Sequence, residues 1–277
     1  QVLTPVGLIR VGQMTSRYGL GILANSGADD DSRFGVRRYG DIVDRALLAL
    51  KPFAPLTGRN SWGDYLTLVL AGDLVYRDEN AVWADGDRAY MGNAGLFYRH
   101  PTFSNGLVFT YRTQEDDDGD ELEAFVLNLN GANIFTLAGT EEGGDLLAVS
   151  LGYEIVGLVG HTDRFQQLGS QEGLDLQSFG GVGRLGLDVA SLGLEVELEV
   201  GFASGDSNPY DDESHAFFFD PDYNVGLIFF DEMLPLITAR SVEISGDPAN
   251  MEAPPKGLDL IPSQERVTNS LYYFPQV

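Results

Sequence analysis

The chain has 277 residues, and its 42 acidic against 17 basic side chains give a formal net charge of −25 at pH 7. This balance excludes a nucleic-acid-binding protein, because phosphate binding needs a basic surface. The absence of cysteine excludes disulfides and thiolate metal sites, and no apolar run reaches the roughly 20 residues that a membrane-spanning helix needs. The 34 glycines, 16 phenylalanines and 12 tyrosines favour strands and turns over helices.

Alternation of apolar and polar residues predicts about ten strands within a single domain at 1–277. In chain order, the expected strands are 6–13, 41–51, 66–76, 90–99, 107–114, 122–129, 145–158, 178–189, 194–202 and 267–274. Most are near the roughly 9–11 residues of a tilted membrane strand, whereas soluble sandwich strands have about five or six. The strand patterns at both ends predict a sheet that continues beyond this chain.

The clearest alternation lies at 194–202. Leu194, Leu198 and Phe202 belong to an apolar row, and Glu195 and Glu197 belong to the opposite row with Glu199. A one-residue slip would place the three carboxylates in the apolar row, so the register is well specified. The same alternation would suit a soluble sheet, so this strand by itself does not identify a membrane protein.

Charged residues on the second face of several strands favour a membrane barrel. A soluble barrel fills its interior with Val, Ile and Leu, whereas a transmembrane barrel has a polar interior and an apolar exterior. The sequence therefore predicts an all-β, antiparallel transmembrane β-barrel. We expect the following residues to line its pore: Arg10, Arg45, Arg99, Arg112, Glu154, Arg184, Glu195, Glu197 and Glu199.

The links between the expected strands alternate in length. The long links are 14–40, 77–88, 115–121, 159–173 and 204–265, and the short ones are 54–61, 100–104 and 190–192. Long loops on one side and short turns on the other are typical of outer-membrane barrels, in which the long loops are extracellular. The fourteen-residue link 130–143 does not fit this alternation.

The loop 14–40 combines glycines with charges of both signs. One hypothesis is that it folds into the lumen as a constriction, and the other is that it is a solvated loop held by Arg–Asp pairs. Asp44 and Arg45, which follow it, face opposite ways in a strand, so at least one of them belongs at the rim. The expected constriction residues are Arg17, Asp29, Asp30, Asp31, Arg33, Arg37 and Arg38.

Three acidic runs, at 29–31, 115–121 and 211–213, raise the question of a bound cation. Calcium is one hypothesis, because carboxylate oxygens are its ligands. We favour the other, in which these are solvated outer loops that divalent cations bridge to lipopolysaccharide. We expect no resident metal or cofactor. The histidines lie on separate links and no catalytic motif is present, so we expect no enzyme activity.

Several blocks of the chain resemble large, poorly characterised Gram-negative outer-membrane barrels of the porin-related, alginate-export-like type. The blocks are VLTPVGLIRVGQM with SRYGLGILANSG, then SRFGVRRYGDIVDR, then LEVELEVGFASGDSNPYDDESHAFFFDPDYNVGLIFFDEM, and finally GLDLIPSQERVTNSLYYFPQV. The resemblance implies further strands before and after this chain. In the alginate exporter, a positively charged constriction is implied to pass a polyanion, and the resemblance implies that Arg10, Arg45, Arg99, Arg112 and Arg184 could serve in that way here. The net charge of −25 and the row Glu195, Glu197 and Glu199 depart from that pattern, so a cation-tolerant or unselective pore is equally compatible.

Two functional hypotheses follow, both for a bacterial outer membrane. The first is a channel that passes small or polymeric polar solutes through a charged lumen. The second is a non-conducting barrel that acts as a surface scaffold or binds a partner through long acidic loops. A soluble, carbohydrate-binding β-protein is disfavoured by the polar inner face. The expected partners are outer-membrane lipid and lipopolysaccharide, a polar solute, and other envelope proteins or further copies of the chain.

Overall fold

The computed structural model describes residues 1–4, 7–27, 40–139, 145–164, 173–208, 211–226, 228–247, 249–250 and 266–277. Within these ranges one sheet contains the strands β1 (Val2–Thr4), β2 (Gly7–Thr15), β3 (Ile42–Leu50), β4 (Leu66–Arg77), β5 (Arg88–Arg99), β6 (Phe103–Glu115), β7 (Glu121–Gly139), β8 (Asp145–Thr162), β9 (Leu174–Val189), β10 (Leu194–Ala203), β11 (Glu213–Ser214) and β12 (Ser270–Gln276). The helices are α1 (Ala54–Thr57), α2 (Trp62–Tyr65), η1 (Trp83–Asp85), η2 (Ala190–Leu192), η3 (Phe229–Met233) and α3 (Leu234–Gly246).

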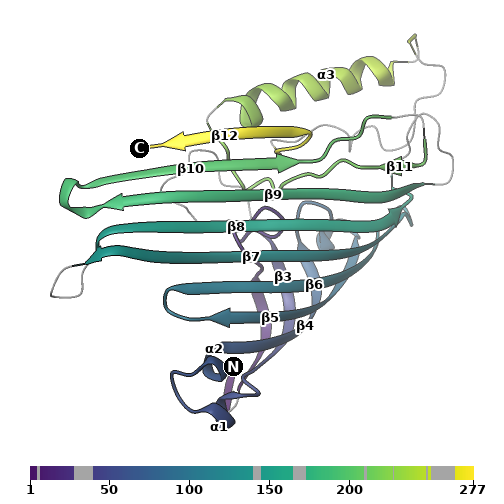
Figure 1. Cartoon of the computed structure of the whole chain (residues 1–277). Helices are drawn as coiled ribbons and strands as arrows, with labels where there is room; N and C mark the ends of the chain where they lie inside the picture. Colours follow the sequence, from purple (N-terminus) through teal and green to yellow (C-terminus); the bar gives the residue numbers. More distant parts are fainter. Residues whose placement is uncertain are drawn as a thin grey trace.

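The strands follow one another in chain order across a curved sheet (Figure 1). Neighbours from β1 to β10 and then β12 pair antiparallel, and the two-residue β11 pairs parallel with β9. The all-β antiparallel prediction is confirmed. The closed barrel is not seen among the described residues, because the sheet is open and ends at β1 on one side and at β12 on the other.

The ten expected strands correspond to β2–β10 and β12, and nine of them agree with the structure to within four residues at each end. The exception is the expected strand at 122–129, because β7 continues to Gly139. The prediction of a fourteen-residue link at 130–143 is therefore wrong. Because β7 ends at Gly139 and β8 begins at Asp145, the residues 140–144 separate these two strands. Polar side chains inside this extension bond across strands, since Asn105 donates to Asn133 at 3.2 Å and accepts from Tyr153 at 2.8 Å.

The helix α3 was also not predicted, because 204–265 was expected to be a loop. Its apolar residues Leu236, Ile237 and Ile244 are exposed. An amphipathic helix is detected in a sequence by one apolar stripe that faces a core. Without such a stripe, the segment reads as an irregular loop. No helix in the part of the chain that the structure describes is long and apolar enough to cross a membrane.

The two faces of the sheet differ in polarity. Along β4 to β10, most of the large apolar side chains in the outward row are more than a third exposed, and the inward row is mostly buried or partly buried. The outward row also contains the polar residues Asn105, Asn133 and Tyr153. The alternation expected for 194–202 is confirmed, with Leu198 outward and Glu199 inward and fully buried. The outward row includes Leu70, Leu96, Leu107, Phe109, Phe125, Leu127, Leu129, Ile155, Val159, Phe179, Leu185, Leu187, Leu198 and Phe202.

The strand directions define two ends of the sheet. The connections 16–41, 78–87, 116–120, 163–173 and 204–269 lie at one end, which we call the loop end. The connections 51–65, 100–102, 140–144 and 190–193 lie at the other, which we call the turn end. The expected alternation of long and short links holds in part. The corrected link between β7 and β8 is short, but 51–65 at the turn end is longer than 78–87, 116–120 and 163–173 at the loop end.

Two segments from the loop end pack against the inward face. Ile22, from 16–27, and Phe219, from 214–226, are both fully buried. They belong to one hydrophobic cluster with inward residues of β7, β8 and β9, namely Val126, Val156 and Val182. We call 16–27 and 214–226 the inward segments. They cover the inward face at the loop end, so the polar residues beneath them are removed from solvent.

Candidate functional site

The inward face carries a buried ion pair between β3 and β4. Arg45 donates through Nε and Nη2 to the two carboxylate oxygens of Asp73, each at 2.7 Å. Asn93 of β5 also donates to Asp73, and Thr110 of β6 donates to Asn93. The hydroxyl of Ser16 accepts a bond from the same guanidinium. Since a buried charge is tolerated only when it is paired and hydrogen-bonded, this ladder explains how two charges occupy the inward face.

Glu154 of β8 is a fully buried carboxylate that anchors an inward segment. Its Oε2 accepts the backbone N–H groups of Gly21 and Ile22 at 2.7 and 3.2 Å. Its Oε1 accepts the side-chain amide of Asn128 at 2.7 Å, and Asn130 donates in turn to Asn128. Gly21 has a φ of 92°, which favours glycine because it lacks a Cβ. Glu154 therefore holds the segment 16–27 against the sheet.

A third cluster joins β9, β10, β12 and the second inward segment. Arg184 donates to Glu199 at 2.8 Å and to the hydroxyl of Tyr223 at 3.1 Å. The hydroxyl of Tyr272 donates to the other oxygen of Glu199 at 2.6 Å. Nearer the loop end, Arg112 forms an ion pair with Asp78. In the clusters that contain an arginine, the guanidinium and the carboxylate neutralise each other, whereas the described donors to Glu154 are uncharged N–H groups.

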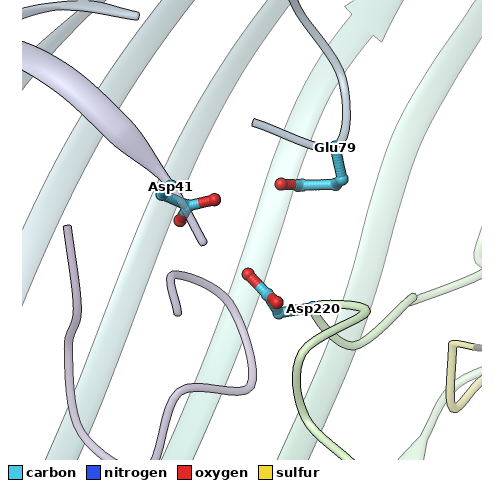
Figure 2. Close-up of side chains that lie close together, drawn as sticks. All are labelled: Asp41, Glu79 and Asp220. Atoms are coloured by element: carbon cyan, nitrogen blue, oxygen red, sulfur yellow. The ribbon is translucent and has the colours of Figure 1, made fainter. Parts of the chain in front are cut away.

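Three further carboxylates meet at the loop end, as Figure 2 shows: Asp41, Glu79 and Asp220. One oxygen from each lies within 4.8 Å of the others, and we call this group the carboxylate cluster. Asp41 precedes β3, Glu79 follows β4, and Asp220 belongs to the second inward segment. Burial raises the pKa of Asp41 and of Asp220 well above the ordinary value, and the neighbouring Glu79 raises both further. Burial, with help from Asp78, raises the pKa of Glu79 to about 7.

The carboxylate cluster has the donor atoms that a divalent cation would need. Its spacing alone assigns no ion, because carboxylates that share protons adopt the same spacing. It does not involve any of the acidic runs that raised the calcium hypothesis: Asp29–Asp31 lie outside the described residues, and the runs at 115–121 and 211–213 lie in other loops.

The expected pore-lining residues divide into two groups. Arg45, Arg112, Glu154, Arg184 and Glu199 are inward but engaged in the clusters above. Arg10, Arg99 and Glu195 also lie in the inward row and are exposed, and Glu197 is partly exposed. This second group lies toward the turn end, at the open part of the inward face. Asp188 stands directly opposite Glu195 there.

The expected constriction loop is described in part. Arg17 is exposed, and 16–27 does fold onto the inward face. Asp29, Asp30, Asp31, Arg33, Arg37 and Arg38 lie outside the described residues. At the rim, Arg45 is inward and buried whereas Asp44 is outward and exposed, as expected for neighbours in a strand.

Sequence reasoning missed Asp41, Asp73, Glu79, Asn128 and Asp220 as members of these clusters. Asp73 and Asn128 could have been found, since each occupies the inward row of a correctly predicted strand. Asp41, Glu79 and Asp220 could not, because they lie in connections far apart in the sequence and only the inward folding of the segments brings them together.

No protein-family model, curated protein or solved structure matches this chain. The family resemblance found in the sequence blocks therefore stays a prediction.

Proposed function

We propose that this sheet is part of the wall of a channel in the bacterial outer membrane, with the outward face in lipid and the inward face along an aqueous passage. The observation that carries the proposal is the contrast between the faces. The outward row exposes large apolar residues from β4 to β10, while the inward row holds hydrogen-bonded charges. Monomeric soluble proteins rarely expose apolar patches larger than a few hundred Å², whereas membrane barrels require them.

The open sheet bears on the same proposal. In hydrocarbon an unpaired strand edge leaves backbone N–H and C=O groups without water, so a membrane sheet must close. Among the residues that the structure describes, β12 pairs on one side with β10, and β1 pairs on one side with Gly7–Ile9 of β2. We propose that further strands outside these 277 residues pair with the two edges and close the wall, as in the large porin-related, alginate-export-like barrels that the sequence blocks resemble.

In the proposed channel, the aqueous passage is narrowest at the loop end. There the inward segments cover the inward face, and their charged neighbours are paired. The turn end is a wider vestibule lined by Arg10, Arg99, Glu195 and Glu197. The buried arginine–carboxylate pairs carry no net charge, so in this proposal the exposed charges of the vestibule contribute to ion preference through their electrostatic effect near a pore. The substrate class is small or polymeric polar solutes.

The inward hydrophobic cluster also favours the second candidate, a non-conducting barrel that serves as a scaffold or binds a partner. Phe217, Phe219 and Tyr223 pack against the inward face, where an open porin would hold water. A plug of this kind would leave the acidic loops as the functional surface.

Reconstitution into planar bilayers separates the two candidates. Folding would first be checked by heat-dependent mobility on a detergent gel. The channel proposal predicts discrete, reproducible conductance steps from the folded protein. Inserted, folded protein without any steps would refute the channel and leave the scaffold.

A further inference from the structure

The carboxylate cluster lies where three connections of the loop end meet. The backbone N–H of Asp41 donates to the carbonyl of Asn25 at 2.7 Å, and the N–H of Asp220 donates to the carbonyl of Ile22 at 2.8 Å. The first bond ties the segment 16–27 to the residue before β3, and the second ties the two inward segments to each other through their backbones. Glu79 comes from the connection between β4 and β5, which is fixed to the sheet by the ion pair of Asp78 with Arg112. The cluster thus joins two inward segments to the wall.

Two of the three carboxylates in the cluster, Asp41 and Asp220, share one hydrogen-bond donor. The backbone N–H of Asn25 lies 3.1 Å from Oδ2 of Asp41 and also 3.1 Å from Oδ2 of Asp220. One N–H cannot neutralise two carboxylates. Two carboxyl groups that accept one donor at equal distances are held close enough that both cannot readily ionise, which is the arrangement of carboxyl groups that share a proton.

The charges around the cluster do not neutralise it. Asp78 raises the pKa of Asp41 and of Glu79, and Asp222 raises that of Asp220, while Arg112 and Arg266 lower the pKa of Glu79. Arg112 is already paired with Asp78. Farther out, Arg164 pairs with Asp116 and donates to the carbonyl of Asn80. Arg77, which pairs with Ile42 beside Asp41 and stands two residues before Glu79, is a further cation near the cluster. When all three carboxyls ionise, they outnumber, together with Asp78 and Asp222, the described cations Arg77, Arg112 and Arg266.

We propose that the carboxylate cluster is a proton-operated latch, which holds the inward segments against the wall when it is protonated and releases them when it ionises. Release would uncover the inward face at the loop end. This inference deepens the proposed function, since it gives the passage a control, but the movement itself does not require that the barrel conducts.

The direction of the pH effect follows from the titration of the cluster. A carboxyl whose pKa is raised in the docked state favours that state at low pH. The stabilisation is complete below the ordinary carboxyl pKa of about 4, and it is lost as the pH rises through the docked-state values. For Glu79 that value is about 7, and for Asp41 and Asp220 the pKa is also raised. The docked arrangement is thus favoured at about pH 5 and disfavoured at about pH 9.

Paired spin labels test this movement without reference to conductance. Because the chain has no cysteine, Ser26→Cys with Asp85→Cys would report the distance from an inward segment to the connection between β4 and β5. With a chelator present, we expect one short, narrow distance distribution at about pH 5 and a longer, broader one at about pH 9. Arg17→Cys with Asp85→Cys is a second pair at exposed positions, in case the label at Ser26 disturbs packing.

Variants then assign the effect to the cluster. Glu79→Gln in the labelled protein should give a smaller lengthening between the two pH values than the parent does, because it removes one of the three ionisable groups while Asp41 and Asp220 still titrate. The matched control Asp118→Asn, on the exposed loop between β6 and β7, should respond as the parent does. The same distribution at both pH values would overturn the latch, as would closure that needs added calcium at about pH 5. Conductance steps measured separately distinguish failure of the latch from failure of the channel.

Discussion

Arg45 and Asp73 sit directly opposite each other on β3 and β4 and form a two-pronged ion pair, with both contacts at 2.7 Å. The side chain of Asp73 is fully buried and that of Arg45 almost so. A pair this buried requires that the inward row of the sheet be shielded from water at Arg45 and Asp73. The pair therefore reports both the orientation of β3 and β4 and the covering of the inward face by Ser16 and Tyr18.

Removing one member of this pair should be strongly destabilising. Asp73→Ala leaves a buried guanidinium without its partner, and we expect a loss of about 3–5 kcal/mol in the free energy of unfolding. Lys51→Ala, which breaks the exposed pair of Lys51 with Asp64, is the matched control and should cost less than about 1 kcal/mol. Equilibrium urea unfolding in lipid vesicles measures both. Equal effects of the two variants would show that Arg45 and Asp73 are solvated.

The outward row should not tolerate a charge if it lies in lipid. Leu127 of β7 is 53% exposed, and on a soluble surface Leu127→Arg would change stability by about 0.5 kcal/mol or less. In a bilayer the same change should cost about 2–4 kcal/mol near the midplane. Asp118→Arg, in the connection between β6 and β7, is the control and should be neutral. Unfolding in vesicles checks both, and a neutral Leu127→Arg contradicts the lipid-facing orientation.

Ion preference should depend on the vestibule rather than on the buried pairs. Glu195→Gln with Glu197→Gln removes two charges at the open part of the inward face, so we expect the preference for cations to fall. Arg10→Gln with Arg99→Gln should shift it the opposite way. Reversal potentials under a salt gradient measure the preference. If both double variants keep the parent's reversal potential, these residues do not line the passage.

Docking of the inward segment 16–27 against the sheet should limit the conductance of the channel. Ile22 is fully buried among Val126, Val156 and Val182, so Ile22→Ala should weaken the docked state by about 2–5 kcal/mol. Single-channel recording should then show larger or more frequent openings. Leu56→Ala removes an exposed leucine of α1 and serves as control. Unchanged openings in Ile22→Ala would mean that 16–27 is not the constriction.

Much of the sheet could be predicted from the sequence because each strand has its own alternation. Leu198 and Glu199 show why: their faces follow from a period of two, and a slip of one residue would bury the wrong row. The long extension of β7 could not be predicted, since its Asn130–Gly131 pair reads as a turn, whereas in the structure Gly131 pairs with Asn105 of β6 and with Tyr153 of β8.

The candidate site was less predictable than the sheet. The sequence indicated that Arg45, Glu154 and Glu199 are inward, and they are, but it did not show that Asp73, Asn128 and Tyr272 neutralise or bond them. Such pairing depends on register and on the inward segments. The contacts of Asp41 with Asp220 are longer-range still, because they exist only when two segments from the loop end fold over the same face.

In the proposed channel wall the two rows of one strand face different media, and β10 offers the most direct measurement of this difference. In a chain without cysteine, Glu197→Cys and Leu198→Cys place single thiols on the inward and outward rows of the same strand. Both parent residues are partly exposed, so both thiols would be accessible in a water-soluble sheet. In vesicles, a membrane-impermeant charged thiol reagent should label Glu197→Cys and leave Leu198→Cys unlabelled until detergent is added. Equal labelling of the two positions in intact vesicles would contradict the account.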